Sequence, residues 1–274
     1  MNTRHPTPSR IPPAVPRARG NAGVLLALLA LLLPPTARAF TATDASTNEP
    51  YATQATWNLG DNGGTGFGEW RQVGSSATPN RSLDADGFAI YANAGVGEAA
   101  VGRSFADDLA LASGTFSVTA THDSTTHFSG FALYSANDAE LLRWGVTTAE
   151  ADAGTYPGFW YAIGAGGQTI YEPIDRIYDP DTPVTADYSI SWSVFSTGMN
   201  IDLSITSDSS PITRQLSLDN SSAVTSIAAL VAGSTQAETL HFDNISAEGP
   251  AVPEPATIAL LLLGTLVLRP RRGK

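Results

Sequence analysis

The chain of 274 residues contains no cysteine, and its single lysine is Lys274. The lack of cysteine excludes disulfide bonds, thiolate catalysis, iron–sulfur clusters and cysteine-type zinc sites. Residues 40–250 contain 25 acidic residues and only six arginines, which gives this stretch a net charge of −19. So negative a field repels phosphate backbones and anionic membrane surfaces. We therefore expect no nucleic-acid partner.

Catalytic patterns are scarce as well. The sequence has no Gly-x-Ser-x-Gly nucleophile elbow, and residues 40–250 contain three histidines: His122, His127 and His241. The polar stretch that holds His122 and His127 favours a solvated loop over a metal or base pair, and His241 favours a structural role. The closely spaced carboxylates that glycoside hydrolysis needs occur only in turn-like sequence, which favours solvated loop charge: Asp84/Asp86, Asp138/Glu140 and Glu150/Asp152. We expect no enzymatic activity.

The N-terminus has the three parts of a secretory signal peptide over residues 1–39. A positive flank, an apolar run of ten residues and a small-residue cleavage pattern follow one another: Arg17 and Arg19, residues 24–33, and Ala37 with Ala39. Ten residues of helix extend about 15 Å, which is too short to cross a membrane of ~30 Å. We predict cleavage after Ala39, which makes Phe40 the first residue of the mature chain.

Residues 249–274 form a tail that also has three parts in a fixed order. A proline-rich motif, an apolar run and a basic cluster follow one another: Val252, Pro253, Glu254 and Pro255, then residues 256–268, then Arg269, Arg271, Arg272 and Lys274. The prolines hold the preceding chain extended. We expect the apolar run to form a short transmembrane helix, with the basic cluster on the cytoplasmic side.

This tail resembles the PEP-CTERM sorting signal, whose members begin with a signal peptide and end in Val-Pro-Glu-Pro, an apolar helix and an arginine cluster. The resemblance covers residues 252–274, and Pro270 within the basic cluster departs from the pattern. It implies an exosortase as partner, an integral-membrane cysteine transpeptidase-like enzyme that cleaves near Pro-Glu-Pro. It also implies a transient membrane anchor and delivery to the cell envelope, cell surface or extracellular matrix of an exopolysaccharide-producing Gram-negative host. The tail is also labelled an ice-binding-protein C-terminal domain, a label that says nothing of ice binding here.

Residues 57–248 have the pattern of short strands and turns, after an extended lead-in over residues 40–56. Residues 114–121 alternate apolar and hydroxyl side chains with period two, as a half-buried strand does. Hairpins and further strands are predicted along the rest of this stretch: residues 128–146, 159–171, 188–195, 200–205, 212–218, 227–231 and 240–245. Many short strands without a sustained helical period predict an all-β fold, a two-sheet antiparallel sandwich.

Part of this pattern is similar to the laminin G/concanavalin A-like jelly rolls of secreted bacterial proteins. The similarity rests on Trp57, residues 62–70, residues 91–93 and the closing strand 242–245. It implies a jelly-roll topology, interaction with glycans or surfaces and, in some members, a structural calcium ion. Asp243 is the calcium ligand that the resemblance selects, and pairing of Asp243 with an arginine is the alternative. Other hard oxygen ligands for calcium are present at Asp61/Asn62, Asp84/Asp86, Asp179/Asp181 and Asn244.

The five tryptophans include one candidate for stacking against sugar rings. Trp192 alternates with serines and Trp144 ends a hairpin strand, so both are expected in the core. In the run Phe159-Trp160-Tyr161 neighbouring side chains point to opposite faces of the strand, so at least one of them points outward. We select Trp160 as the ligand-binding residue, with core packing as the alternative.

Together these features predict an exported protein of the cell surface or matrix, with a non-enzymatic module that interacts with polysaccharide or another envelope component. No cofactor is expected apart from the calcium ion that the jelly-roll resemblance leaves open. Two alternatives stay open. One is a glycan-active hydrolase or lyase with an unrecognised carboxylate pair, and the other is a passive coat protein whose acidic surface swells or binds cations.

Overall fold

The computed structural model describes residues 37–253, except for residues 75–76, 94, 96, 107–108, 124–127, 148–156, 166–167, 178–181, 208–209 and 233–237. The predicted signal helix, transmembrane segment 256–268 and basic cluster lie outside the described residues, as do His127, Glu254 and Pro255. Within the described part no helix is long and apolar enough to cross a membrane. One compact unit, Ala39–Val252, contains the sandwich.

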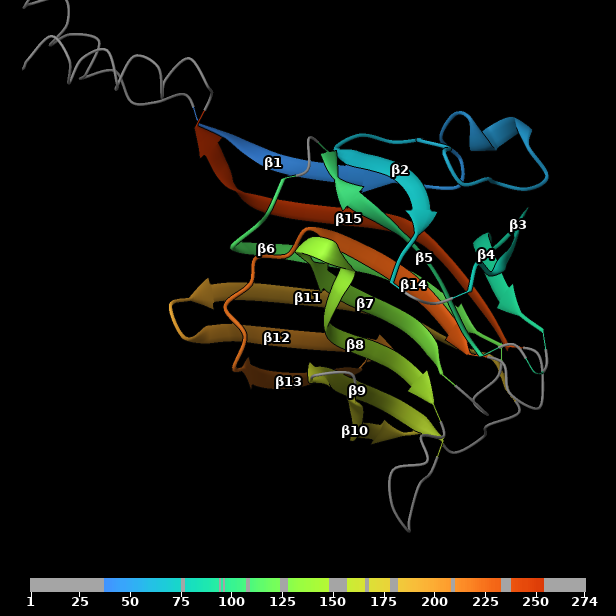
Figure 1. Cartoon of the computed structure of the whole chain (residues 1–274). Helices are drawn as coiled ribbons and strands as arrows, with labels where there is room; N and C mark the ends of the chain where they lie inside the picture. Colours follow the sequence, from blue (N-terminus) through green and yellow to red (C-terminus); the bar gives the residue numbers. More distant parts are fainter. Residues whose placement is uncertain are drawn as a thin grey trace, which may run out of the picture. The chain divides into compact units, whose positions relative to one another are not determined.

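The described strands form two antiparallel sheets, which confirms the predicted all-β sandwich (Figure 1). Sheet A has the order β13 (Ser210–Leu218), β12 (Gly198–Ser207), β11 (Val184–Phe195), β6 (Ser113–His122), β15 (Glu238–Pro253), β4 (Gly87–Ala92) and β3 (Asn80–Asp84), and β1 (Ala37–Asp44) also pairs with β15. Sheet B has the order β10 (Gln168–Arg176), β9 (Gly158–Ala165), β8 (Ala139–Thr147), β7 (Ser129–Ser135), β14 (Ser226–Ala232), β5 (Glu98–Phe105) and β2 (Phe67–Gln72).

Period-two alternation places the core between the two sheets. In β6 the buried residues Phe116, Val118 and Ala120 alternate with polar residues, as the sequence predicts. The same alternation in β11 buries Trp192, and Trp144 of β8 is buried as well, so both core assignments are confirmed. The predicted hairpins are confirmed too, as β7–β8 with a 3₁₀ turn at Ala136–Asp138 and as β9–β10.

The segment expected as an extended lead-in, residues 40–56, contributes to the sandwich. It contains residues 40–44 of β1 and a 3₁₀ turn at Tyr51–Thr53, and Tyr51 is buried in the core. The glycine-rich turn that follows packs closely against β1. Gly64 and Gly66 both have positive φ, and a Cβ on either would lie within 2.4 Å of a backbone oxygen of β1. These two positions therefore require glycine.

The predicted closing strand is the central part of β15, which lies between β6 and β4 in sheet A. Its pairing with β6 shifts between Asp243 and Ser246, and Asn244 has a φ of 54° at this bulge. The shift aims the side chains before and after it at different neighbours. Before the bulge His241 lies between Ala89 of β4 and Thr121 of β6, and after it Ser246 pairs with Ser117 of β6.

Candidate functional site

Hydroxyl, amide and carboxylate side chains form rows across the outer face of sheet A. Strand pairing defines one row as Ser246, Ser117, Ser189, Ser204 and Thr213. It defines the next row as Glu248, Thr115, Ser191, Asp202 and Gln215. We call the residues of these two rows the polar face. Because neighbouring strands lie about 4.8 Å apart, the polar face presents hydrogen-bonding groups at a regular spacing.

Two shallow grooves run along the polar face, with volumes of about 340 and 330 Å³. Both are lined by Ser189 and Ser204, so they adjoin one another. The first extends to Arg214 and the second to Asn244. The one aromatic residue in their lining, Tyr188, is buried. The grooves therefore offer hydrogen bonds and no ring for stacking.

Several groups of the polar face are already paired with one another. The hydroxyls of Ser117 and Ser246 lie 2.7 Å apart, and the Gln215 amide donates to Asp202 Oδ1 at 2.7 Å. A hydroxyl can donate one hydrogen bond and accept two, and a carboxylate accepts several. These pairs therefore hold the side chains in place and leave capacity for a ligand.

The structure does not support Trp160 as a sugar-stacking platform, because only 3% of this residue is exposed. Its neighbour Phe159 belongs to the core between the sheets, so Trp160 points to the outer face of sheet B, as the alternation predicts. That outer face carries a second buried cluster, which includes Phe128, Tyr134 and Leu230. Pointing outward on sheet B is therefore not the same as exposure to solvent.

Asp243 lies against the segment that follows β1. Its Oδ1 accepts a hydrogen bond from the Ser46 backbone at 2.8 Å, and its Oδ2 accepts one from the Ser46 hydroxyl at 3.0 Å. Both carboxylate oxygens thus hold the N-terminal segment of the sandwich. In the described residues Asp243 contacts Ser46 rather than an arginine, and its role as a calcium ligand stays a prediction.

His122 is wrongly predicted as part of a solvated loop. It is the last residue of β6 and is fully buried, with Nδ1 2.7 Å from the Ser129 hydroxyl and Nε2 2.7 Å from the Tyr188 hydroxyl. Burial lowers the pKa of His122 to about 3. The inner-face alternation of β6 continues through this residue, and that is the signal that would have placed it.

His241, in contrast, lies on the outer side of sheet A between two carboxylates. Its Nε2 is 3.1 Å from Asp123 Oδ2, and its Nδ1 is 3.3 Å from Asp84 Oδ2. Asp84 is the last residue of β3 and Asp86 lies in the turn before β4, and each offers a carboxylate oxygen within 4.8 Å of the other ligand atoms of this group. The sequence pairs Asp84 with Asp86 but gives no sign of His241 beside them.

On sheet B, two carboxylates, Glu98 and Glu140, accept hydrogen bonds from the same arginine. The Arg143 guanidinium donates to Glu98 and, with two nitrogens, to Glu140. Glu140 accepts a further hydrogen bond from the Tyr134 hydroxyl at 3.3 Å. Burial raises the pKa of Tyr134, and the charge of Glu140 raises it further, so this phenol stays protonated. Asp138, which the sequence groups with Glu140, pairs instead with Arg71.

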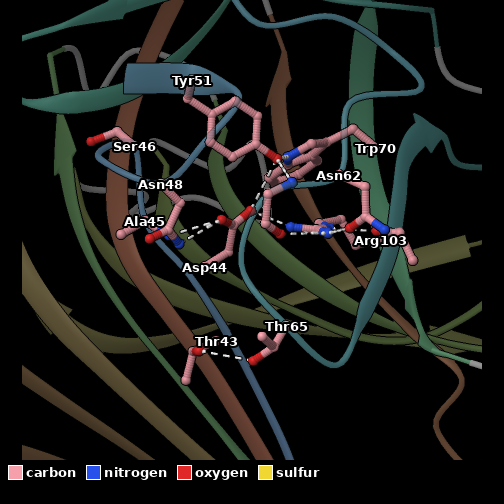
Figure 2. A network of polar contacts seen from close by, with 12 residues as sticks. Thr43, Asp44, Ala45, Ser46, Asn48, Tyr51, Asn62, Thr65, Trp70 and Arg103 are labelled. Carbon is pink, nitrogen blue, oxygen red and sulfur yellow. Dashed lines mark hydrogen bonds and ion pairs between the residues drawn. The ribbon is translucent and has the colours of Figure 1, made fainter. Parts of the chain in front are cut away.

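Buried polar groups form a network around Asp44 and Arg103 (Figure 2). Asp44 accepts hydrogen bonds from Arg103, from the Asn48 amide at 3.2 Å and from the Tyr51 hydroxyl at 3.2 Å. Arg103 donates also to Asn62 and to the backbone oxygens of residues 63 and 68. Burial raises the pKa of Asp44 against the opposing effect of Arg103, and burial raises the pKa of Tyr51 to about 12.

This network, which the sequence analysis missed, is structural. The Tyr51 hydroxyl accepts hydrogen bonds from the Gly63 backbone and the Trp70 indole, both at 2.9 Å, while it donates to Asp44. Figure 2 shows these groups converging from β1, the glycine-rich turn and sheet B. The described groups pair with one another, so the network closes the N-terminal segment onto the sandwich. Arg103 within an apolar strand was the available signal, since a buried guanidinium needs a partner.

No family model and no curated protein matches the chain. Solved structures show a similar arrangement of strands. One is domain 4 of AbnA, an extracellular arabinanase from Geobacillus stearothermophilus in complex with arabinotriose, at 16% identity and a TM-score of 0.40, covering 82% of this chain and 98% of that one. Another is a legume lectin-like domain from Entamoeba histolytica, at 9% identity and a TM-score of 0.36, covering 66% and 90%. At these identities and TM-scores no inference about ligand or activity follows.

Proposed function

We propose that the chain is an exported, non-enzymatic protein of the cell envelope or matrix whose polar face binds a neutral polysaccharide. The polar face is the observation that carries this proposal. Seven of its ten residues line two adjoining grooves, and their hydroxyl, amide and carboxylate groups match the hydroxyls of a sugar chain as donors and acceptors. The grooves give an extended chain a path across several strands.

The charge of the protein favours a neutral partner. The stretch of residues 40–250 carries a net charge of −19, and Asp202 and Glu248 belong to the polar face itself. An anionic polysaccharide would be repelled by this field. A neutral sugar chain can instead donate its hydroxyl hydrogens to the carboxylates, and such charge-assisted bonds are the stronger kind.

Sorting by the PEP-CTERM tail is the second part of the proposal, with an exosortase as partner and the membrane as a transient anchor. The two predicted processing sites, after Ala39 and near Pro253–Pro255, flank the compact unit Ala39–Val252. Cleavage at both sites would therefore release the sandwich nearly whole. Mass spectrometry of the mature protein tests this, beside a variant that carries Pro253→Ala, Glu254→Ala and Pro255→Ala. Retention of residues 256–274 by the unaltered protein would contradict exosortase processing.

Binding is tested by pull-down of the full chain on host exopolysaccharide and on neutral and acidic reference polysaccharides. The double variant Ser189→Ala, Ser204→Ala removes the hydroxyls that both grooves share, and we expect its affinity to fall by about tenfold, or 1.4 kcal/mol. The matched control is Ser221→Ala, Ser222→Ala, two exposed serines away from the polar face. Failure of the unaltered chain to bind, or equal binding by the double variant, would overturn the proposal.

A further inference from the structure

The side chains around His241 form a group of candidate metal ligands near the edge of sheet A. Asp84 ends β3, Asp86 lies in the turn that follows, and His241 comes from β15, where it pairs with Ala89 of β4. The ligand atoms of Asp84, Asp86 and His241 all lie within 4.8 Å of one another. These residues are far apart in the sequence, so the fold itself brings them together.

The hydrogen bond at Nε2 of His241 determines which ring nitrogen carries the proton in the neutral ring. A carboxylate only accepts hydrogen bonds, so the contact of 3.1 Å between Nε2 and Asp123 Oδ2 places the proton of the neutral ring on Nε2. The lone pair of the neutral ring then lies on Nδ1. Histidines that bind metals have this arrangement, in which a carboxylate accepts the other ring N–H and orients the ring.

The Nδ1 atom of His241 is buried and has no hydrogen-bond partner. Asp84 Oδ2 lies 3.3 Å from it, so two atoms that both carry lone pairs are close neighbours. They repel unless a positive charge lies between them. Two ligands of a tetrahedral Zn²⁺ ion, with bonds of about 2.0–2.1 Å, lie about 3.3 Å apart. The spacing of Nδ1 and Oδ2 is that of two ligands on one ion.

We propose that His241 Nδ1, Asp84 and Asp86 bind a divalent transition-metal ion of the Zn²⁺ class, with Asp123 as a positioning residue. An imidazole nitrogen beside two carboxylates suits zinc and its neighbours, whereas calcium takes oxygen ligands. The site is therefore distinct in residues and in metal from the calcium ligand predicted at Asp243. Three protein ligands leave a fourth position for water or another ligand.

The proposal is independent of polysaccharide binding, since Asp84, Asp86 and His241 do not belong to the polar face. The other positive charge that fits between Nδ1 and Asp84 is a proton. In that case His241 is an imidazolium held by Asp84 and Asp123, and the chain binds no transition metal. A metal titration separates the two cases.

The experiment uses the full chain, purified in detergent and freed of metal. Isothermal titration with Zn²⁺ is expected to show one ion bound per chain, while Ca²⁺ does not displace it. Because the chain has no cysteine, thiols contribute nothing to the signal. In nitrogen-15 NMR spectra the Nδ1 resonance of His241 is expected to shift on addition of Zn²⁺. The resonances of His122 stay in place, because both of its ring nitrogens are already paired.

Matched variants assign the binding to these residues. Asp84→Asn and His241→Gln are each expected to weaken Zn²⁺ binding by at least about tenfold, and Asp123→Asn by about 10–100-fold. Asp84 is partly exposed, so Asp84→Asn keeps the test valid if His241→Gln disturbs the fold, as circular dichroism would show. Asp202→Asn is the control and leaves the Zn²⁺ affinity unchanged, because Asp202 belongs to β12 and not to this group of ligands. The proposal is overturned if the unaltered chain binds no Zn²⁺, or if Asp84→Asn binds as tightly as the unaltered chain.

Discussion

Two polar clusters join distant segments of the sandwich, and they differ in how completely their groups are paired. In the network around Asp44 and Arg103, the described donors and acceptors engage one another. At His241 one ring nitrogen is paired with Asp123, whereas the other is buried without a hydrogen-bond partner. Asp44 and Arg103 are both buried, whereas in the second cluster the Nδ1 atom is buried and the carboxylates of Asp84 and Asp123 are 39% and 41% exposed. The unsatisfied atom is what separates a candidate binding site from a structural clamp.

The largest expected effect comes from opening the closed cluster. Asp44→Ala leaves the Arg103 guanidinium buried without its carboxylate, and removing one partner of a buried pair costs about 3–5 kcal/mol. We expect the free energy of unfolding to fall by that amount in urea denaturation. A loss below about 1 kcal/mol would show that water or another group takes the place of Asp44. Sugar binding by the remaining folded fraction should be unchanged, because Asp44 lies outside the polar face.

The cluster around His241, in contrast, should increase the free energy of unfolding when an ion binds to it. An ion that binds only the folded chain stabilises it by about 2.7 kcal/mol at a free concentration one hundred times its dissociation constant. Addition of Zn²⁺ is therefore expected to raise the free energy of unfolding of the unaltered chain, and to raise that of Asp84→Asn by no more than about 1.4 kcal/mol at the same concentration, because its affinity is at least about tenfold lower. Equal stabilisation of both chains would place the ion elsewhere.

Buried His122 makes the free energy of unfolding depend on pH. Burial lowers the pKa of His122 to about 3 from 6.5, so the unfolded chain binds the extra proton between these values. Stability that is present above pH 6.5 is then lost as the pH falls, by about 2 kcal/mol between pH 7 and pH 5. Urea denaturation at both pH values measures this loss. His122→Gln should have a smaller dependence on pH, and an equal dependence in both chains would contradict the assignment.

Local patterns in the sequence predict most of the strands and hairpins. The β7–β8 and β9–β10 hairpins pair residues that are close in the chain, so alternation and turn residues suffice to find them. The contribution of β1 was missed because its partner β15 lies some two hundred residues away, and nothing local marks such a pairing. Both polar clusters depend on the same kind of long-range pairing.

Single residues show where period two is enough and where it is not. Extending the alternation of β6 by one step would have placed His122 in the core, so that error came from the polar composition of the stretch. The alternation gives Trp160 its correct side of sheet B, and yet Trp160 is buried, on a side that also carries a second buried cluster. The side of the sheet to which a side chain points follows from its position in the strand, whereas its exposure to solvent depends on what the rest of the chain packs there.

The smallest expected effect comes from the same chemistry at the surface. Asp138 accepts two hydrogen bonds from the Arg71 guanidinium, at 2.7 and 2.9 Å, but the two side chains remain 31% and 38% exposed. Water screens such a pair, so Asp138→Ala should lower the free energy of unfolding by no more than about 1 kcal/mol.

Hydrogen bonds from Arg71 lower the pKa of Asp138 below 3.8, so its contribution is present near neutral pH and is lost as the pH falls through the folded-state value. Urea denaturation of Asp138→Ala beside Asp44→Ala compares one kind of ion pair in two environments. If the surface variant lost as much stability as the buried one, burial and complete pairing would not explain the difference between the clusters. We expect Asp44→Ala to lower the free energy of unfolding much more than Asp138→Ala does, because the Asp44–Arg103 pair is buried.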